Sequence, residues 1–138
     1  MLMIYADSFG YKTTIKTVDD APEIDEAQTI ENCLVGLIQV EAEDEADPAY
    51  IETKLVKNLK WAARKNDTNK VVIHTFAHLS DSKASIEISK QILDNSAERM
   101  KKADYEVYLT PFGYFFDLDI KAPGKSLARI FKNIEVTD

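Results

Sequence analysis

The sequence Val71-Val72-Ile73-His74-Thr75-Phe76-Ala77-His78-Leu79-Ser80 sets an apolar, β-branched run directly before a short loop. A second pairing, Val107-Tyr108-Leu109-Thr110 before Pro111-Phe112-Gly113-Tyr114-Phe115-Phe116, follows one long amphipathic segment. A strand, a loop, a helix and a further strand in this order predict an α/β fold. Both loops then lie at the same end of a sheet, which is where α/β proteins place small-ligand sites.

The composition is that of one soluble domain spanning residues 1–138. The chain is 45% hydrophobic and 30% charged, and 138 residues can bury a core without covalent staples. The single cysteine, Cys33, lies in an apolar run and is expected to be a reduced core residue. No apolar stretch approaches membrane-spanning length and no leader segment is visible, so we expect a cytoplasmic protein without a membrane partner.

The net charge of −7 argues against general adhesion to nucleic acid, because broad phosphate binding needs a cationic face. A narrow site for the end of one strand is still compatible with that charge. The basic residues concentrate in two segments, 54–70 and 121–132. We interpret them as solvated helix and loop surface.

The first part of the chain is expected to form a hairpin. Met1 to Ala6 is an apolar run typical of a buried strand, Asp7-Ser8 is a turn signal, and Phe9 to Val18 is the partner strand. The acidic segment from Asp19 to Glu31 contains a proline and is expected to be an exposed connection.

The segment from Glu31 to Glu41 is nearly all apolar, which indicates a strand covered on both faces. Gly36 within it indicates either close approach by a backbone or ligand, or a simple bulge. Asp47-Pro48 then starts a helix as an N-cap followed by proline. Its inner stripe repeats at helical spacing: Ile51, Leu55, Leu59 and Ala62.

A second helix is expected from Ser82 to Ala103, again with an apolar stripe on its inner side. Strands are predicted at Tyr105 to Thr110 and at Tyr114 to Ile120. The segment from Ser126 to Ile134 fits either a strand or a short helix.

The residues offer little conventional catalytic machinery. Of the two histidines, His74 lies inside a strand and is interpreted as structural, whereas His78 stands on the following loop and could meet a ligand. No residue spacing indicates a metal, a phosphate-binding glycine loop or a serine hydrolase elbow. The expected site is therefore built from backbone groups and aromatic rings, with one histidine nearby.

Three segments carry a family resemblance: Cys33-Leu34-Val35-Gly36-Leu37-Ile38-Gln39-Val40-Glu41, Phe76-Ala77-His78-Leu79-Ser80 and Pro111-Phe112-Gly113-Tyr114. Together they resemble the archaeal editing domain at the N-terminus of threonyl-tRNA synthetase, which is related in fold to D-aminoacyl-tRNA deacylase. The resemblance covers nearly the whole chain. It implies a layered α/β/β fold in which two helices pack on a sheet.

The resemblance implies an aminoacyl-tRNA hydrolase that removes serine mischarged on threonine tRNA. A synthetic site made for threonine loses only one methyl group when serine enters, worth roughly 1–3 kcal/mol, so a second site must correct the error. In this family the attacking water is thought to be positioned by backbone groups and by the 2′-hydroxyl of the terminal ribose. Side chains assist.

The resemblance also implies roles for individual residues. The terminal adenosine would lie by Val40 and Glu41, and the aminoacyl group by Ala77 and His78. The facing wall of the site would be formed by Phe112, Gly113, Tyr114 and Phe115.

Three polar groups of the family pattern are replaced in this chain. Phe116 stands at the position of the family lysine, Arg129 at that of a glutamate and Ala6 at that of a histidine. With His78, Phe116 and Arg129 mark the expected catalytic positions. Lys121 would face away from them on a regular strand, whereas Lys125 could fold back.

The implied partners are the aminoacylated 3′ end of threonine tRNA, a synthetase catalytic core and a second copy of the chain in a homodimer. The resemblance implies no cofactor or metal in this domain, since ATP and zinc binding belong to the full-length synthetase. Two alternatives stay open: a weakened or non-catalytic relative that binds the aminoacyl-adenosine end, and a structural module that holds a synthetase dimer together.

Overall fold

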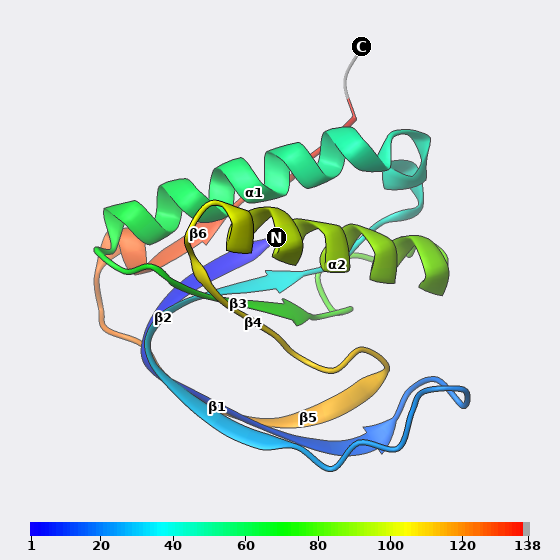
Figure 1. Cartoon of the computed structure of the whole chain (residues 1–138), viewed down its shortest axis with the longest axis horizontal. Helices are drawn as coiled ribbons and strands as arrows, with labels where there is room; N and C mark the ends of the chain where they lie inside the picture. Colours follow the sequence, from blue (N-terminus) through cyan, green and yellow to red (C-terminus); the bar gives the residue numbers. More distant parts are fainter. Residues whose placement is uncertain (137–138) are drawn as a thin grey trace.

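The computed structural model describes residues 1–136 as one six-stranded sheet with two long helices (Figure 1). The strands follow the order β4-β3-β2-β1-β5, and β6 pairs with β1 beside β5. The elements in chain order are β1 (Leu2–Lys16), β2 (Ala27–Ile38), the 3-10 helix η1 (Ala42–Ala46), α1 (Pro48–Lys65), β3 (Lys70–Thr75), α2 (Ile86–Lys102), β4 (Glu106–Leu109), β5 (Tyr114–Lys121), η2 (Ser126–Ala128) and β6 (Arg129–Phe131).

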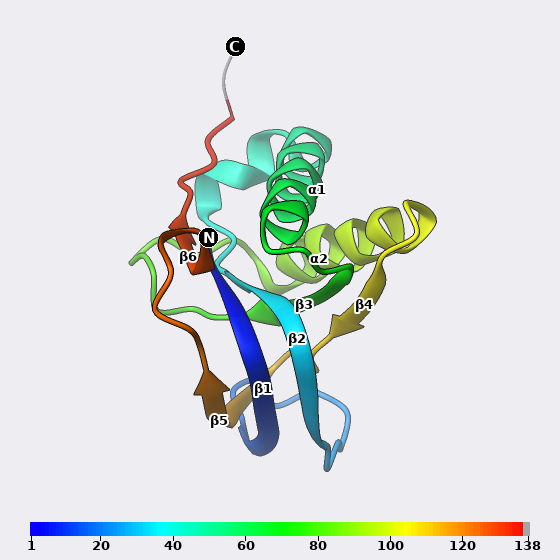
Figure 2. The ribbon, with the colours of Figure 1, turned by 90° about the vertical axis from the view of Figure 1, so that its left-hand side faces the viewer.

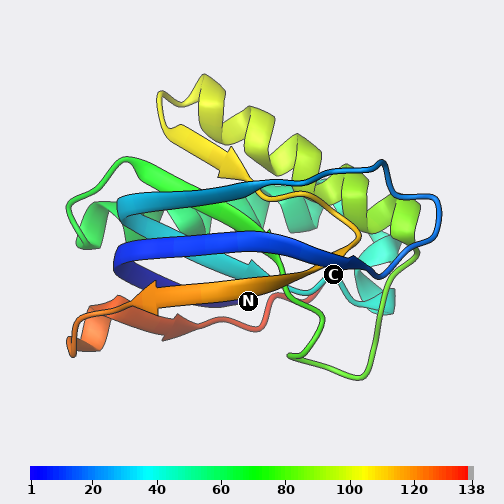
Figure 3. The same cartoon turned by 90° about the horizontal axis from the view of Figure 1, so that it is seen from below.

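The sheet curls, so that the molecule has three layers. Both helices pack on one face of the sheet, over the larger apolar core. Beyond the helices, β1 and β2 run on side by side (Figure 2). With β5 they form the lower layer of Figure 1, which faces the viewer in Figure 3. A second core, the lower core, includes Phe9, Cys33 and Val72 and fills the concave side. The expected α/β/β layering is confirmed.

The expected turn at Asp7-Ser8 is wrong, because β1 is one strand of 15 residues. The polar pair lies instead where the sheet bends. Pairing with β2 runs through Ala6–Cys33 and resumes at Ser8–Glu31, and Asn32 between them has a φ of 51°, in the left-handed region. The local signal was real, but continued pairing on both sides of the bend keeps the strand intact.

The connection after β1 is shorter than expected. Residues 19–31 were expected to be an exposed connection, and most of them are exposed, but β2 already begins at Ala27 and pairs with Lys12. Pairing with a long neighbouring strand stabilises these polar residues as a strand, an effect that local composition does not reveal.

Helix α1 follows the prediction. The Asp47 side chain accepts a hydrogen bond from the Tyr50 N–H at 3.1 Å, and the predicted inner stripe is buried. Gly36 lies beneath this helix, and a Cβ there would stand 2.9 Å from Leu59 Cδ2. Pairing of Gly36 continues on both sides, so the expected bulge is wrong. The close approach comes from a side chain of α1 and not, as expected, from a backbone or a ligand.

Helix α2 begins at Ile86 rather than at Ser82, because the intervening residues make other bonds. Ser85 is the N-cap, and its hydroxyl accepts from the Ile88 N–H at 3.2 Å. The undecided segment from Ser126 to Ile134 contains both a short 3-10 helix and a strand, η2 and β6.

Candidate functional site

The two sequence motifs meet at one cleft of about 430 Å³, a size suited to a small ligand. It lies between the N-terminal part of α2 and the segments that follow β1, β2 and β3, with the start of β5 opposite. The lining residues are Thr17, Val18, Ile38, Gln39, Val40, Thr75, Ala77, His78, Lys83, Ala84, Ile86, Ser89, Leu93, Phe112, Gly113 and Phe115.

Gln39 fixes the loop that carries the first motif. Its Oε1 accepts hydrogen bonds from the N–H groups of Leu79 and Ser80, at 2.7 and 2.9 Å. Its Nε2 donates to the carbonyls of Ser80 and Ser82, at 2.7 and 2.8 Å. One side chain therefore satisfies four backbone groups. Sequence reasoning missed this role, although a glutamine at the end of an apolar strand was its signal.

The opposite wall depends on Gly113. Its φ of +90° favours glycine, and a Cβ there would lie 3.1 Å from the Ala21 Cβ. The Gly113 carbonyl accepts a hydrogen bond from the Thr17 N–H at 2.8 Å. This bond ties the second motif to the end of β1.

His78 and Lys83 are the ionisable side chains among the described lining residues. Both are exposed. The His78 ring packs edge-on against Phe76, with ring centroids 5.0 Å apart. The N–H groups of Ala77 and His78 have no acceptor within residues 1–136, so they are free to bind a ligand oxygen.

The predicted binding residues divide into two groups. Val40, Ala77, Phe112, Gly113 and Phe115 line the cleft together with His78.

Glu41 and Tyr114 do not line the cleft, although both brace it. Glu41 accepts a hydrogen bond from the Ser80 hydroxyl at 2.9 Å. The Tyr114 hydroxyl accepts from the Ile24 N–H at 2.9 Å and donates to the Pro22 carbonyl.

The positions of the replaced family groups do not line the cleft either. Phe116 packs in the lower core, with ring centroids 4.8 Å from His74 and 5.7 Å from Tyr11. Arg129 is exposed and pairs with Ile4 between β6 and β1. Ala6 is buried in the lower core. The structure thus does not bring Phe116 or Arg129 together with His78.

His74 has the structural role that the sequence predicted. It is 2% exposed, and its Nδ1 is 2.9 Å from the Thr110 hydroxyl oxygen. Burial lowers the pKa of the His74 imidazole to about 4, so the ring is neutral at pH 7. This pairing links β3 to the residue before the second motif.

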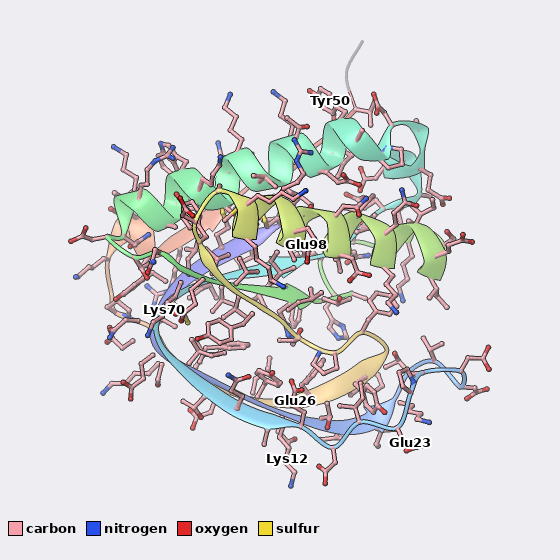
Figure 4. The ribbon with its side chains drawn as sticks, viewed as in Figure 1. Lys12, Glu23, Glu26, Tyr50, Lys70 and Glu98 are labelled. Atoms are coloured by element: carbon pink, nitrogen blue, oxygen red, sulfur yellow. The ribbon has the colours of Figure 1, made fainter. Side chains whose placement is uncertain are left out.

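Charged side chains lie on both faces of the lower layer, with Glu26 on the inner face (Figure 4). Figure 4 shows Lys12 pointing away from the helices, on the outer side of the lower layer. Glu26 accepts a hydrogen bond from the Tyr11 hydroxyl, and burial with this bond raises the pKa of that hydroxyl. Within residues 1–136, no three potential ligands gather to hold a metal ion. No helix in that range is long and apolar enough to cross a membrane.

Comparison with solved structures shows the fold. A structure described as the c-Myc DNA unwinding element binding protein aligns with 96% of this chain and 97% of its own. The TM-score is 0.65 and the identity 11%, a likeness that shows the fold alone. The chain has the layered α/β fold of the D-aminoacyl-tRNA deacylase type, as predicted.

Sequence comparison then shows the family. The model of the archaea-specific editing domain of threonyl-tRNA synthetase matches residues 1–134, and the chain belongs to this family. The threonine–tRNA ligase of Thermococcus gammatolerans is 29% identical over 137 residues, and that of Methanosphaera stadtmanae 30% over 135. These matches cover 97% and 96% of this chain, which spans 22% of the length of each relative.

Proposed function

We propose that this domain hydrolyses the ester that joins serine to threonine tRNA. The observation that carries the proposal is the shared cleft, which joins Ala77 and His78 on one side to Gly113 on the other. Family membership supports an editing role, and the cleft supplies a place for a small aminoacyl group. We further propose that a synthetase catalytic core delivers the tRNA end, because the relatives are longer ligases.

In the proposed reaction, water attacks the ester carbonyl carbon and the bond to the ribose oxygen breaks. The products are serine and tRNA with a free terminal hydroxyl. The N–H groups of Ala77 and His78, which have no acceptor among residues 1–136, are suited to hold the oxyanion that forms on the carbonyl oxygen. The substrate 2′-hydroxyl would pass a water proton to the leaving oxygen, with His78 as an assisting base.

Preorganisation supports this mechanism. Because Gln39 holds the backbone on the C-terminal side of His78, the loop needs little rearrangement when charge develops on the substrate. The site therefore fits a chemistry that relies on fixed backbone groups rather than on a side-chain nucleophile.

A non-hydrolytic binding module is the second candidate. It is favoured by the packing of Phe116, which leaves the cleft without any cation from β5. Such a module would bind the terminal adenosine and release it with its aminoacyl ester intact.

The test is a deacylation assay with threonine tRNA charged with serine and with threonine. We expect the serine ester to be cleaved faster. Ala77→Leu should fill the cleft and abolish cleavage, whereas Ala49→Leu, an equal enlargement on the exposed first turn of α1, should leave it unchanged. Absence of serine release by the folded parent domain would refute hydrolysis, and retained binding of the charged tRNA end would then favour the binding module.

A further inference from the structure

Lys83 supplies the ammonium group of the cleft. Of the described residues that line it, Lys83 carries the sole ammonium group and none carries a carboxylate. This contrasts with the whole chain, which has 24 acidic and 17 basic residues. Among the described residues, the lining itself therefore carries one ammonium group and no carboxylate, a distribution that favours an anionic ligand group.

The backbone on both sides of Lys83 is held in place. The Ser82 carbonyl accepts from Gln39 Nε2 at 2.8 Å, and the Ser82 hydroxyl oxygen is 3.0 Å from the Ala42 nitrogen. On the other side, the Ala84 N–H donates to the Val40 carbonyl at 3.0 Å. The start of the Lys83 side chain is thus fixed at the cleft although its ammonium group is solvated.

The ammonium group is not neutralised by a neighbour. Within residues 1–136, no carboxylate lies within salt-bridge distance of Lys83. Two carboxylates of η1 come close to Lys83 but bond to its neighbours in the chain: Glu43 accepts from the Ser82 hydroxyl at 3.0 Å, and Glu45 from the Ser85 N–H at 3.2 Å. Lys83 therefore has its charge available for a ligand.

The chemistry of an aminoacylated strand end decides which group this charge can meet. The aminoacyl group carries a positive ammonium, the adenosine is neutral, and the phosphodiester that precedes the adenosine is negative. We propose that Lys83 binds this phosphodiester at the mouth of the cleft and so sets the depth at which the strand end enters. The identity of the strand rests on the proposed function, whereas the recognition of the phosphate rests on the cleft itself.

The test compares two probes that need no turnover, the trinucleotide CpCpA and adenosine, in titrations followed by calorimetry or NMR. Lys83→Gln should weaken CpCpA binding about tenfold, the scale of one charge-assisted hydrogen bond, and leave adenosine binding unchanged. The slope of log affinity against log salt should fall in magnitude by about 0.7, the value for one phosphate on a single strand. Lys90→Gln, the same charge change on an exposed residue outside the lining, should alter neither probe.

Unchanged CpCpA affinity in Lys83→Gln would overturn the proposal, as would equal losses for CpCpA and adenosine or failure of CpCpA to bind the parent domain. These outcomes are independent of hydrolysis. A parent that cleaves the serine ester while Lys83→Gln binds CpCpA normally leaves the proposed function standing without the phosphate contact. A parent that binds CpCpA through Lys83 without cleaving the ester supports the contact and refutes hydrolysis.

Discussion

Replacing Gln39 should loosen the loop of the first motif while leaving the rest of the fold intact. Gln39→Met keeps the length of the side chain but removes all four hydrogen bonds to the loop backbone, which are 2.7–2.9 Å long. At about 0.5–1.5 kcal/mol for each bond the sum is about 2–6 kcal/mol. Because the loop is only partly buried, water replaces some of the lost partners. We therefore expect local opening to become easier by about 2–4 kcal/mol.

Hydrogen exchange measures this opening directly. The amides of Leu79 and Ser80, which donate to Gln39, should exchange roughly 30- to 900-fold faster in Gln39→Met, since each 1.36 kcal/mol is a factor of ten. The amide of Val72, in the buried strand β3, should keep its rate. Gln91→Met is the matched control, because Gln91 is exposed on α2 and makes no side-chain hydrogen bond within residues 1–136.

A second substitution separates the two halves of the contact. Gln39→Glu retains an acceptor for the two N–H groups but places a carboxylate oxygen against the two carbonyls. We expect intermediate protection of Leu79 and Ser80 near pH 7. Rates in Gln39→Met that match those of the parent would refute the claim that Gln39 holds the loop.

Three further predictions follow from buried contacts. His74 has a folded pKa of about 4 against 6.5 in the unfolded chain, so the unfolded state takes up the proton and stability falls as pH drops from 6.5 towards 4. In urea titrations the unfolding free energy should fall by about 2 kcal/mol between pH 7.5 and 5 on account of His74. In His74→Gln, whose side chain does not titrate, the fall over this range should be smaller by that amount. Phe116→Lys should lower the unfolding free energy by about 2–4 kcal/mol, because the amine would enter the lower core beside Tyr11. The same variant should not hydrolyse the serine ester faster than the parent. A variant that is both faster and equally stable would contradict this placement of Phe116. Gly36→Val should lower the unfolding free energy by about 1–3 kcal/mol, because the valine overlaps Leu59. Adding Leu59→Ala should recover part of this loss in thermal melts, and additive losses would show that the overlap is not the cause.

Much of the fold was readable because local signals and tertiary packing agree. Asp47-Pro48 starts α1 as predicted, and the stripe from Ile51 to Ala62 faces the core. The error at Asp7-Ser8 has a different origin. A bend in a paired strand and a turn between strands favour the same residue types, and only the partner strand distinguishes them.

The candidate site was predictable in outline and not in detail. The two motifs were expected to share a cleft, and the structure brings Ala77, His78 and Gly113 together. Gln39 and Lys83 were missed because their roles depend on where a distant loop returns. The position of Phe116 could not be judged either, since the curl of the sheet determines whether its side chain meets the cleft or the lower core.

The way Gln39 holds the loop affects how the residues of this cleft can change in evolution. Gln39 bonds to the main chain of residues 79–82 and not to their side chains, so the scaffold does not depend on which side chains those positions carry. Rim residues such as Lys83 and Phe115 can then be exchanged without dismantling the loop. A single well-placed amide thus separates the architecture of the cleft from its ligand preference, and makes the rim a natural starting point for redesigning what the domain accepts.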